Sequence, residues 1–220
     1  MNQTLFVTGT DTDAGKTVVS CALLRGLAEA GIKACGFKPV ASGAEASQYG
    51  LASSDAVALL EASAPGVTLA EINPLLFVPA IAPHLAAAAV GHVIDGQVLS
   101  NAHAILAARY PALIAEGAGG WLTPFHEGLL LGDWVAQQAW PVLLVVRIRL
   151  GCLNHALLTA EAIASRGARL AGWVANLAPP ASNEAEGMIA TLSARLGPPL
   201  WCQQRQIAAP KAAIHSLFAC

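Results

Sequence analysis

Short runs of apolar residues, rich in β-branched side chains, alternate along this chain with stretches in which apolar residues recur every three or four positions. The first pattern is typical of a buried strand and the second of a helix with one buried face. Their alternation predicts a doubly wound α/β fold with a mostly parallel sheet and helices on both faces. Because no linker or repeat divides the chain, we expect residues 1–220 to form a single domain.

The individual elements follow from where each pattern begins and ends. Strands are predicted in the runs TLFVTG from Thr4, KACGFKPV from Lys33, ALIAEG ending at Gly117, PVLLVV from Pro141 and LAGWVAN from Leu170. Helices are predicted from Lys16 to the stop at Gly31, from Asp55, from Asp95 to Ala108, from Asp133 to Gln138, from Leu153 to Ser165 and from Asn183 to Leu196. The first helix is expected to bury Val19, Leu23, Leu24 and Leu27.

Composition narrows the class of protein. Apolar residues make up 55% and charged residues 12% of the chain, against about 25% charged in ordinary soluble proteins, so much of the chain must be buried in a core or a subunit interface.

A net charge of −2 without a Lys/Arg cluster excludes nucleic-acid binding. Prolines and histidines interrupt the uncharged stretch 72–94, which excludes a membrane span. The N-terminus lacks secretory features and the five cysteines form no C-x-x-C pair, so we expect a cytoplasmic protein.

The stretch GTDTDAGKT, residues 9–17, is the first candidate for chemistry. It nearly fits the phosphate-binding loop, except that Thr10 occupies the first fixed glycine position and Gly9 lies one residue early. The predicted strand before it and helix after it are the context that such a loop requires. Lys16 would then reach the terminal phosphates and Thr17 would bind magnesium; the alternative is a glycine turn that carries an ordinary solvated lysine.

Two carboxylates and a second lysine are candidates for the same crevice. Glu116 ends the predicted strand ALIAE, where a buried carboxylate needs a partner, and Asp55 begins a predicted helix. With Thr17 they would offer Mg²⁺ the hard oxygen ligands it prefers, although Asp55 alone could equally be a helix N-cap. Lys38, in GFKPVASG, either points into the crevice near Ser42 and neutralises an anion, or is a surface lysine at a strand end.

Several motifs occur together in one register: GTDTDAGKT, GFKPVASG, SSDA at Ser53, NP at Asn73, PH at Pro83, EGAGGWLTP, DWV and LGCLNHALLTAEAI. Taken together they resemble the dethiobiotin synthetase family from residue 4 to about residue 177, and the early Gly9 is that family's own variant of the loop. The resemblance implies ATP-dependent, Mg²⁺-dependent closure of a ureido ring on 7,8-diaminononanoate with CO₂ or bicarbonate, within a cytoplasmic homodimer.

The resemblance also implies roles for particular residues. Lys38 would be the catalytic lysine, with Lys16 on the terminal phosphates and Asp11 assisting. Contacts to ATP would come from Asp13, Ala14, Gly15, Lys16, Thr17, Val18, Asp55, Glu116, Gly117, Ala118, Gly119, Asn176 and Leu177, with Asn176 at the adenine edge. Mg²⁺ would be held by Thr17, Asp55 and Glu116. The substrate would contact Thr12 and Ser42 and, from the other subunit, Leu150, Gly151, Cys152, Leu153 and Asn154.

Two features depart from the family's pattern. Residues 200–220, LWCQQRQIAAPKAAIHSLFAC, form a divergent tail without the Ile-Pro or Leu-Pro turn that closes over the adenine. Arg147 stands directly after a buried strand, where a small residue is expected, and a desolvated arginine there requires a carboxylate partner.

Three other functions stay open on the sequence. They are a related amide-forming ligase, a partner-regulating P-loop ATPase and an impaired homologue. Asp11 counts against the second of these, because such ATPases often carry a lysine at that place. The six histidines show no paired ligand spacing, so no further metal site is expected.

Overall fold

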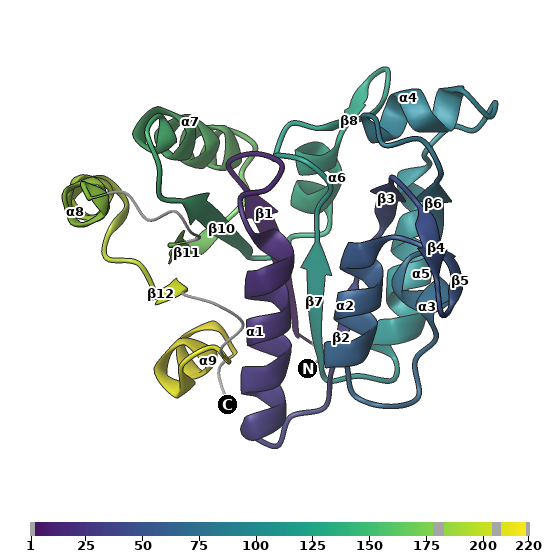
Figure 1. Ribbon diagram of the computed structural model, residues 1–220, viewed down its shortest axis with the longest axis horizontal. Helices are drawn as coiled ribbons and strands as arrows, with labels where there is room; N and C mark the ends of the chain where they lie inside the picture. Colours follow the sequence, from purple (N-terminus) through teal and green to yellow (C-terminus); the bar gives the residue numbers. More distant parts are fainter. Residues whose placement is uncertain (1–2, 178–182, 204–207, 219–220) are drawn as a thin grey trace.

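The computed structural model describes residues 3–177, 183–203 and 208–218. At its centre lies a six-stranded parallel sheet in the order β12-β11-β10-β1-β7-β2 (Figure 1). Its strands are β1 (Gln3–Gly9), β2 (Ala34–Phe37), β7 (Ala112–Glu116), β10 (Val142–Arg147), β11 (Leu170–Asn176) and β12 (Trp201–Gln203). The chain builds β2 and β7 on one side of β1 and β10, β11 and β12 on the other. The doubly wound parallel fold predicted from the sequence is therefore confirmed.

The helices are α1 (Lys16–Glu29), α2 (Ser54–Ala62), α3 (Leu69–Ile72), α4 (Pro83–Ala88), α5 (Gly96–Ala107), α6 (Leu131–Gln137), α7 (Cys152–Ser165), α8 (Ala185–Leu196) and α9 (Lys211–Leu217). Three pairs of short strands accompany the sheet: β3 (Val40–Ser42) with β6 (Leu75–Phe77), β4 (Glu45–Ser47) with β5 (Gly50–Ala52), and β8 (Pro124–His126) with β9 (Leu129–Leu130). The predicted helices begin and end within about two residues of these bounds. The short pairs, β12, α3, α4 and α9 are absent from the prediction because their apolar runs are too short to show a period.

Helices cover both faces of the sheet, as β2 shows directly. A Cβ placed on Gly36 would lie 2.8 Å from the Cβ of Leu59, so α2 packs closely against β2 on that face. The next residue, Phe37, faces the ring of His103 on α5, with 5.7 Å between ring centroids. Successive strand side chains point to opposite faces, so α2 and α5 cover opposite sides. Figure 1 shows α1 and α2 in front of the sheet and α5 behind it.

The four residues that the helical period places in the core are buried as predicted. Val19, Leu23 and Leu27 are fully buried on α1, and Leu24 nearly so. On the other face an aromatic layer contacts β1, where the ring of Phe6 lies against Trp121 and Trp140. The two layers fix α1 and the loop before it on a rigid sheet.

The chain after residue 200 is part of the same packed unit. β12 pairs with β11, and the backbone N–H of Ala209 donates to the carbonyl of Ala22 on α1 at 2.8 Å. A Cβ on Gly26 would lie 2.9 Å from the Ala209 carbonyl oxygen, so α1 presents a glycine where the tail crosses it. The family's adenine-closing turn is expected after Pro199, and part of that stretch, residues 204–207, lies outside the described residues.

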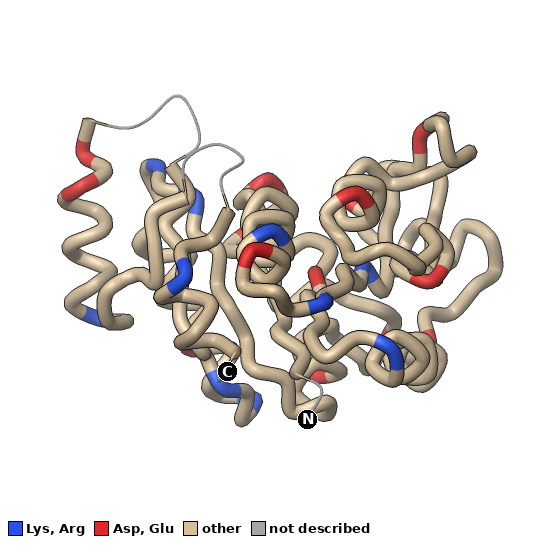
Figure 2. The backbone as a smooth tube through the Cα atoms, turned by 90° about the horizontal axis from the view of Figure 1, so that it is seen from below, with Lys and Arg blue, Asp and Glu red and all other residues tan. Residues whose placement is uncertain are grey.

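Charges are sparse on the surface. Figure 2 shows Lys, Arg, Asp and Glu scattered along the chain with long uncharged stretches between them. Within the described ranges, no helix combines the length and the apolar character needed to cross a bilayer.

His103 is a half-buried titratable group in the aromatic layer. Its Nε2 lies 2.8 Å from the Thr4 hydroxyl, and its ring centroid lies 4.4 Å from that of Trp140. Burial lowers the pKa of His103 from 6.5 to about 4. The folded protein therefore holds a neutral imidazole at a pH where the unfolded chain already binds a proton.

We expect stability to fall as the pH falls from 6.5 towards 4, because the unfolded state binds more protons in this window. The His103→Gln variant should lose part of this slope, by up to about 1.4 kcal/mol per pH unit. Urea unfolding at several pH values measures it, with His215→Gln, an exposed histidine, as the control. Equal slopes in wild type and His103→Gln would contradict the prediction.

Candidate nucleotide and substrate site

An open cavity of about 870 Å³ lies where β1, β2 and β7 end, at the edge that a doubly wound sheet uses for ligands. Most of the predicted site residues line it: Asp11, Thr12, Asp13, Gly15, Lys16, Thr17, Val18, Lys38, Ser42, Asp55, Ala118, Gly119 and Asn176. Residues from well-separated parts of the chain thus meet in one place, as the sequence predicted.

The conformation of the loop between β1 and α1 explains why the glycine is at position 9, one residue before the usual position in a phosphate-binding loop. A Cβ on Gly9 would lie 2.9 Å from the Cβ of Ala14 and 3.1 Å from Cγ of Lys16, so the loop folds back onto the end of the strand. Asp13 and Gly15 both have positive φ, 60° and 97°, which gives the loop its tight curvature. A glycine is therefore required at position 9, while Thr10 is accommodated.

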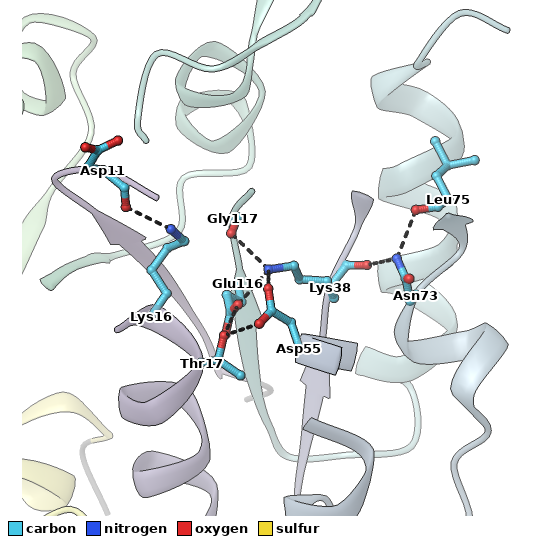
Figure 3. Close-up of polar contacts among 9 residues, drawn as sticks. All are labelled: Asp11, Lys16, Thr17, Lys38, Asp55, Asn73, Leu75, Glu116 and Gly117. Carbon is cyan, nitrogen blue, oxygen red and sulfur yellow. Dashed lines mark hydrogen bonds and ion pairs between the residues drawn. The ribbon is translucent and has the colours of Figure 1, made fainter. Parts of the chain in front are cut away.

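Lys16 is the first residue of α1 and is almost fully buried. Its ammonium donates to the backbone carbonyl of Asp11 at 3.1 Å, so the loop holds it over the cavity (Figure 3). Burial, together with the nearby charge of Lys38, lowers the pKa of Lys16 below its ordinary value of 10.5. An anionic ligand in the loop would relieve both effects, which suits a phosphate-binding lysine.

Asn176 holds the loop from the end of β11, two strands away from β1 in the sheet. Its Nδ2 donates to the carbonyl of Ala14 at 2.8 Å, and a Cβ on Gly15 would lie 2.0 Å from this nitrogen. Glycine is thus the residue that lets β11 and the loop meet. Leu177 is turned toward β12 through its N–H, which donates to the Gln203 carbonyl, and it does not line the cavity. The adenine contacts expected from both residues stay predictions.

Four side chains from α1, α2, β7 and the end of β2 converge beside the loop (Figure 3). The Lys38 ammonium lies 2.7 Å from Oδ2 of Asp55, 2.6 Å from Oε1 of Glu116 and 3.3 Å from the Gly117 carbonyl. The Thr17 hydroxyl lies 2.8 Å from Asp55 Oδ1 and 2.9 Å from Glu116 Oε1. A hydroxyl has one proton, so it donates to one carboxylate at a time.

The surface-lysine alternative for Lys38 is therefore wrong, since its side chain is 3% exposed, against 0% for Glu116 and 41% for Asp55. Burial alone would lower the pKa of Lys38, but the charges of Glu116 and Asp55 and hydrogen bonds to both raise it above 10.5. Burial alone would raise the pKa of Asp55, but Lys38 lowers it below 3.8. The site therefore holds a charged ammonium and a charged Asp55 side by side at neutral pH.

The residue types and one unpaired atom fit a divalent cation. Oε2 of Glu116 is buried and has no hydrogen-bond partner among the described residues, and a buried carboxylate oxygen normally has one. Asp55 and Thr17 add oxygen atoms of the kind Mg²⁺ prefers, and it commonly takes the rest from water and phosphate. Among the described residues no group of three or more His, Cys, Asp or Glu could hold a metal, here or elsewhere, so a cation at this site would have two carboxylates and the Thr17 hydroxyl as its protein ligands.

The helix-cap alternative for Asp55 is also wrong. The N-cap of α2 is Ser53, and Asp55 lies inside the first turn with its carboxylate on Lys38 and Thr17. The helix thus begins one residue before the predicted start. This shift places the Asp55 side chain on the cavity rather than on the helix end.

Other predicted residues lie farther from the reactive cluster. The carboxylate of Asp11 points away from Lys16 (Figure 3), accepts from the N–H of Thr12 and lies 3.7 Å from Arg149. Leu150–Asn154 do not line the cavity of their own chain, and Leu150 is 97% exposed. Ala14, Glu116 and Gly117 do not line the cavity, although Glu116 and the Gly117 carbonyl contact the Lys38 ammonium.

Arg147 is half-buried at the end of β10, beside Asn176 on β11. It makes no ion pair with any described residue, so the carboxylate partner expected for a desolvated arginine is not found there. Partial exposure of the side chain is the physical reason that such a partner is not required.

Several lining residues went unpredicted. They are mostly small or apolar: Ala41, Ser53, Ala80, Ile81, Ala82, Pro83, Gly120, Thr123 and Pro124. Pro83 begins α4, and Ala80 and Ile81 precede it, so a loop far along the chain forms one wall. Family motifs quoted from the sequence contain six of them, Ala41, Ser53, Pro83, Gly120, Thr123 and Pro124, which is a signal of family likeness rather than chemistry, whereas Ala80, Ile81 and Ala82 gave no signal.

A parallel sheet with a glycine-rich loop, a loop lysine, a hydroxyl at the next position and a carboxylate at the end of β7 defines a P-loop nucleotide-binding protein. A family model described as an AAA domain matches residues 3–200. The fold is similar to the septum site-determining protein MinD of Pyrococcus horikoshii, solved with Mg-ADP, at 15% identity and a TM-score of 0.56, covering 99% of this chain and 87% of that one.

Within that class, relatives with similar sequences identify one enzyme family. An ATP-dependent dethiobiotin synthetase of Pseudescherichia vulneris is 47% identical over 200 residues, covering 90% of this chain and 83% of the relative. Another from Escherichia coli O157:H7 is 46% identical over 201 residues, covering 91% and 89%. The chain belongs to the ATP-dependent dethiobiotin synthetase family.

Proposed function

We propose that this chain uses ATP and CO₂ to close a ureido ring on 7,8-diaminononanoate, giving dethiobiotin, ADP and phosphate. The observation that carries the proposal is the buried Lys38 ammonium, which faces the cavity between two carboxylates and beside the phosphate-binding loop. Membership in the dethiobiotin synthetase family supports the choice of substrates.

The chemistry requires three steps. One amine of the substrate bonds to the carbon of CO₂ and loses a proton, which gives a carbamate. A carbamate oxygen bonds to the terminal phosphorus of ATP, and the bond to ADP breaks. The second amine then attacks the carbamoyl carbon, loses its proton and expels phosphate, which closes the ring. Each stage carries negative charge on oxygen, so positioning and charge neutralisation are the protein's main contribution.

The residues of the cluster divide this task. Lys38 neutralises the carbamate and the transferred phosphoryl group. Lys16 and the backbone of residues 13–18 bind the ATP phosphates, at the start of α1, where helix N–H groups favour anions. Thr17, Asp55 and Glu116 would hold Mg²⁺, which supplies charge neutralisation between the phosphates when bound. Thr12 and Ser42 line the cavity beyond Lys38 and orient the diamine.

We further propose that the working form is a cytoplasmic homodimer, in which Leu150–Asn154 of one subunit complete the substrate site of the other. The 97% exposure of Leu150 supports this, because it leaves the start of this segment accessible to a second subunit. Exposed apolar residues around α4, Val78, Ile81, Leu85, Val90 and Val93, add apolar surface for a subunit contact. Sedimentation equilibrium of the purified protein tests this; a monomer at assay concentration would contradict it.

Phosphate release tests the proposed activity. The purified protein is incubated with ATP, Mg²⁺ and bicarbonate, with and without 7,8-diaminononanoate. Release that requires the diamine, with dethiobiotin detected by mass spectrometry, is the expected result. Release without the diamine would instead indicate an ATPase switch or another substrate, and no release would indicate an impaired homologue or a different nucleotide.

Glu116→Gln should raise the Mg²⁺ concentration that supports half-maximal turnover by about tenfold or more. The substitution keeps the shape of the side chain but removes the negative charge that attracts the cation. Mg²⁺ titrations of phosphate release and of ATP binding measure it, with Glu61→Gln on the exposed side of α2 as the matched control. An unchanged titration for Glu116→Gln would count against its ligand role.

A further inference from the structure

Asn73 is a buried residue directly after α3 that contacts the backbone at Lys38. Its Nδ2 donates to the Lys38 carbonyl at 2.8 Å and to the Leu75 carbonyl at 2.9 Å (Figure 3). Asn73 does not line the cavity and touches none of the carboxylates that surround the ammonium. Asn73 is connected to the site through the backbone of Lys38.

The backbone at Lys38 lacks the support that a regular strand would give it. β2 ends at Phe37 and β3 begins at Val40, and Pro39 between them has no N–H to donate to a neighbouring strand. Residues 72 and 73 replace that support: the N–H of Lys38 donates to the Ile72 carbonyl at 2.8 Å, and its carbonyl accepts from Asn73. Both polar groups of the Lys38 backbone are therefore held by one short segment.

The second hydrogen bond of Asn73 extends this support to the substrate wall. Leu75 is the first residue of β6, which pairs with Val40 of β3, and β3 ends at Ser42. The amide thus ties the Lys38 backbone to the start of the two-stranded unit that carries Ser42. A shift of Asn73 would move the lysine relative to that wall.

The chemistry of the contact selects asparagine. Both hydrogens of the amide go to carbonyl oxygens, whereas Oδ1 is buried without a partner among the described residues. An aspartate at this place would set negative oxygens against two carbonyls. A buried acceptor left unpaired destabilises the fold. The NH₂ group of Asn73, which donates both hydrogen bonds, is therefore the part of the side chain that stabilises this position.

We propose that Asn73 is a positioning residue that fixes the Lys38 backbone, and through it the reach of the Lys38 ammonium, for the ring-closing reaction. This rests on the proposed function, because Lys38 is the group that meets the reacting anions. The ammonium is at the far end of a long side chain, so a small rotation of the backbone at its base moves it by a larger distance, and errors of about 1 Å at a reacting group can cost about 100-fold in rate.

The test compares Asn73→Ala with Ser63→Ala. Ser63 is the matched control because its hydroxyl accepts from Gly36 on β2 at 2.9 Å and donates to Leu59 at 2.6 Å, supporting the same strand without touching Lys38. We expect kcat of Asn73→Ala to fall about tenfold or more, with the KM for ATP changed less than about twofold. Ser63→Ala should lose stability while kcat stays near that of wild type.

A readout without turnover separates this proposal from the proposed function. Hydrogen exchange of the Lys38 backbone amide, which donates to the Ile72 carbonyl at 2.8 Å in the segment that Asn73 holds, should become faster in Asn73→Ala in the free protein and stay unchanged in Ser63→Ala. In a Lys38→Met background, Asn73→Ala should cause no further loss of turnover, because the two residues act as one unit.

The outcomes are distinct. If wild type turns over the diamine but Asn73→Ala and Ser63→Ala lose kcat equally, or if exchange of the Lys38 amide is the same in wild type and Asn73→Ala, the positioning role is overturned. If wild type does not turn over the diamine, the proposed function fails, while exchange of the Lys38 amide still decides the structural part. Should Asn73→Ala not fold, Asn73→Ser, which keeps one donor, is judged by the same criteria.

Discussion

Lys38→Met is expected to lower kcat by about 100- to 1,000-fold while the affinity for ATP stays within a few-fold of wild type. Methionine keeps the length and apolar stem of the side chain but removes the ammonium that lies 2.7 Å from Asp55 and 2.6 Å from Glu116. No other cation of the described chain forms an ion pair with these carboxylates. The carbamate and phosphoryl charges would then develop beside uncompensated negative charge.

Single-turnover kinetics with ATP and the diamine measure the chemical step, and nucleotide binding is measured separately. Lys38→Arg is the control for charge, because it keeps a cation whose planar shape does not match a fully buried ammonium site. We expect it to recover part of the activity at most. A kcat for Lys38→Met within a few-fold of wild type would remove this lysine from the mechanism.

The same substitution has a stability signature with a defined pH dependence. The raised pKa of Lys38 means that its charged ammonium contributes stability that is fully present below pH 10.5, while its carboxylate partners are ionised, and that is lost as the pH rises through the raised value. The lowered pKa of Asp55 gives stability above pH 3.8 that is lost as the pH falls below it. Lys38→Met should therefore unfold more readily across the neutral range, and Mg²⁺ should restore part of the loss.

The sequence predicted the parts of this site that carry local signals. The loop at residues 9–17 has a motif, a preceding strand and a following helix, so its fold and its lysine were readable without tertiary information. Glu116 was readable because a carboxylate at the end of an apolar strand must meet a partner. Lys38 was a candidate because it lies at the end of a predicted strand, and the ends of parallel strands meet at one edge of the sheet.

What the sequence could not predict depends on contacts between distant segments. The role of Asp55 stayed open because the helix start could not be placed to one residue, and one residue separates a cap from a cavity-lining side chain. Asn73 lies 35 positions from Lys38, and nothing in an NP dipeptide indicates that its amide bonds a lysine carbonyl. The wall formed by Ala80–Pro83 consists of small or apolar residues that show no hydrophobic periodicity.

Lys16→Ala is expected to reduce kcat/KM by about a thousandfold or more and to leave the oligomeric state unchanged. The ammonium is buried at the start of α1 and is held by the Asp11 carbonyl at 3.1 Å, where it meets the terminal phosphates of a bound nucleotide. Lys33→Ala, at an exposed lysine outside the cavity, makes the same chemical change and should behave as wild type.

The lowered pKa of Lys16 adds a second expectation. Because burial and the charge of Lys38 favour its neutral form, Lys16 loses its proton at a lower pH than an ordinary lysine with a pKa of 10.5. ATP binds the charged form better, so the affinity of wild type for ATP should decline as the pH rises through this lowered pKa. The Lys16→Ala variant should lack that decline, as calorimetric titrations at increasing pH would show. Normal turnover by the variant, or the same alkaline decline, would separate the loop lysine from phosphate binding.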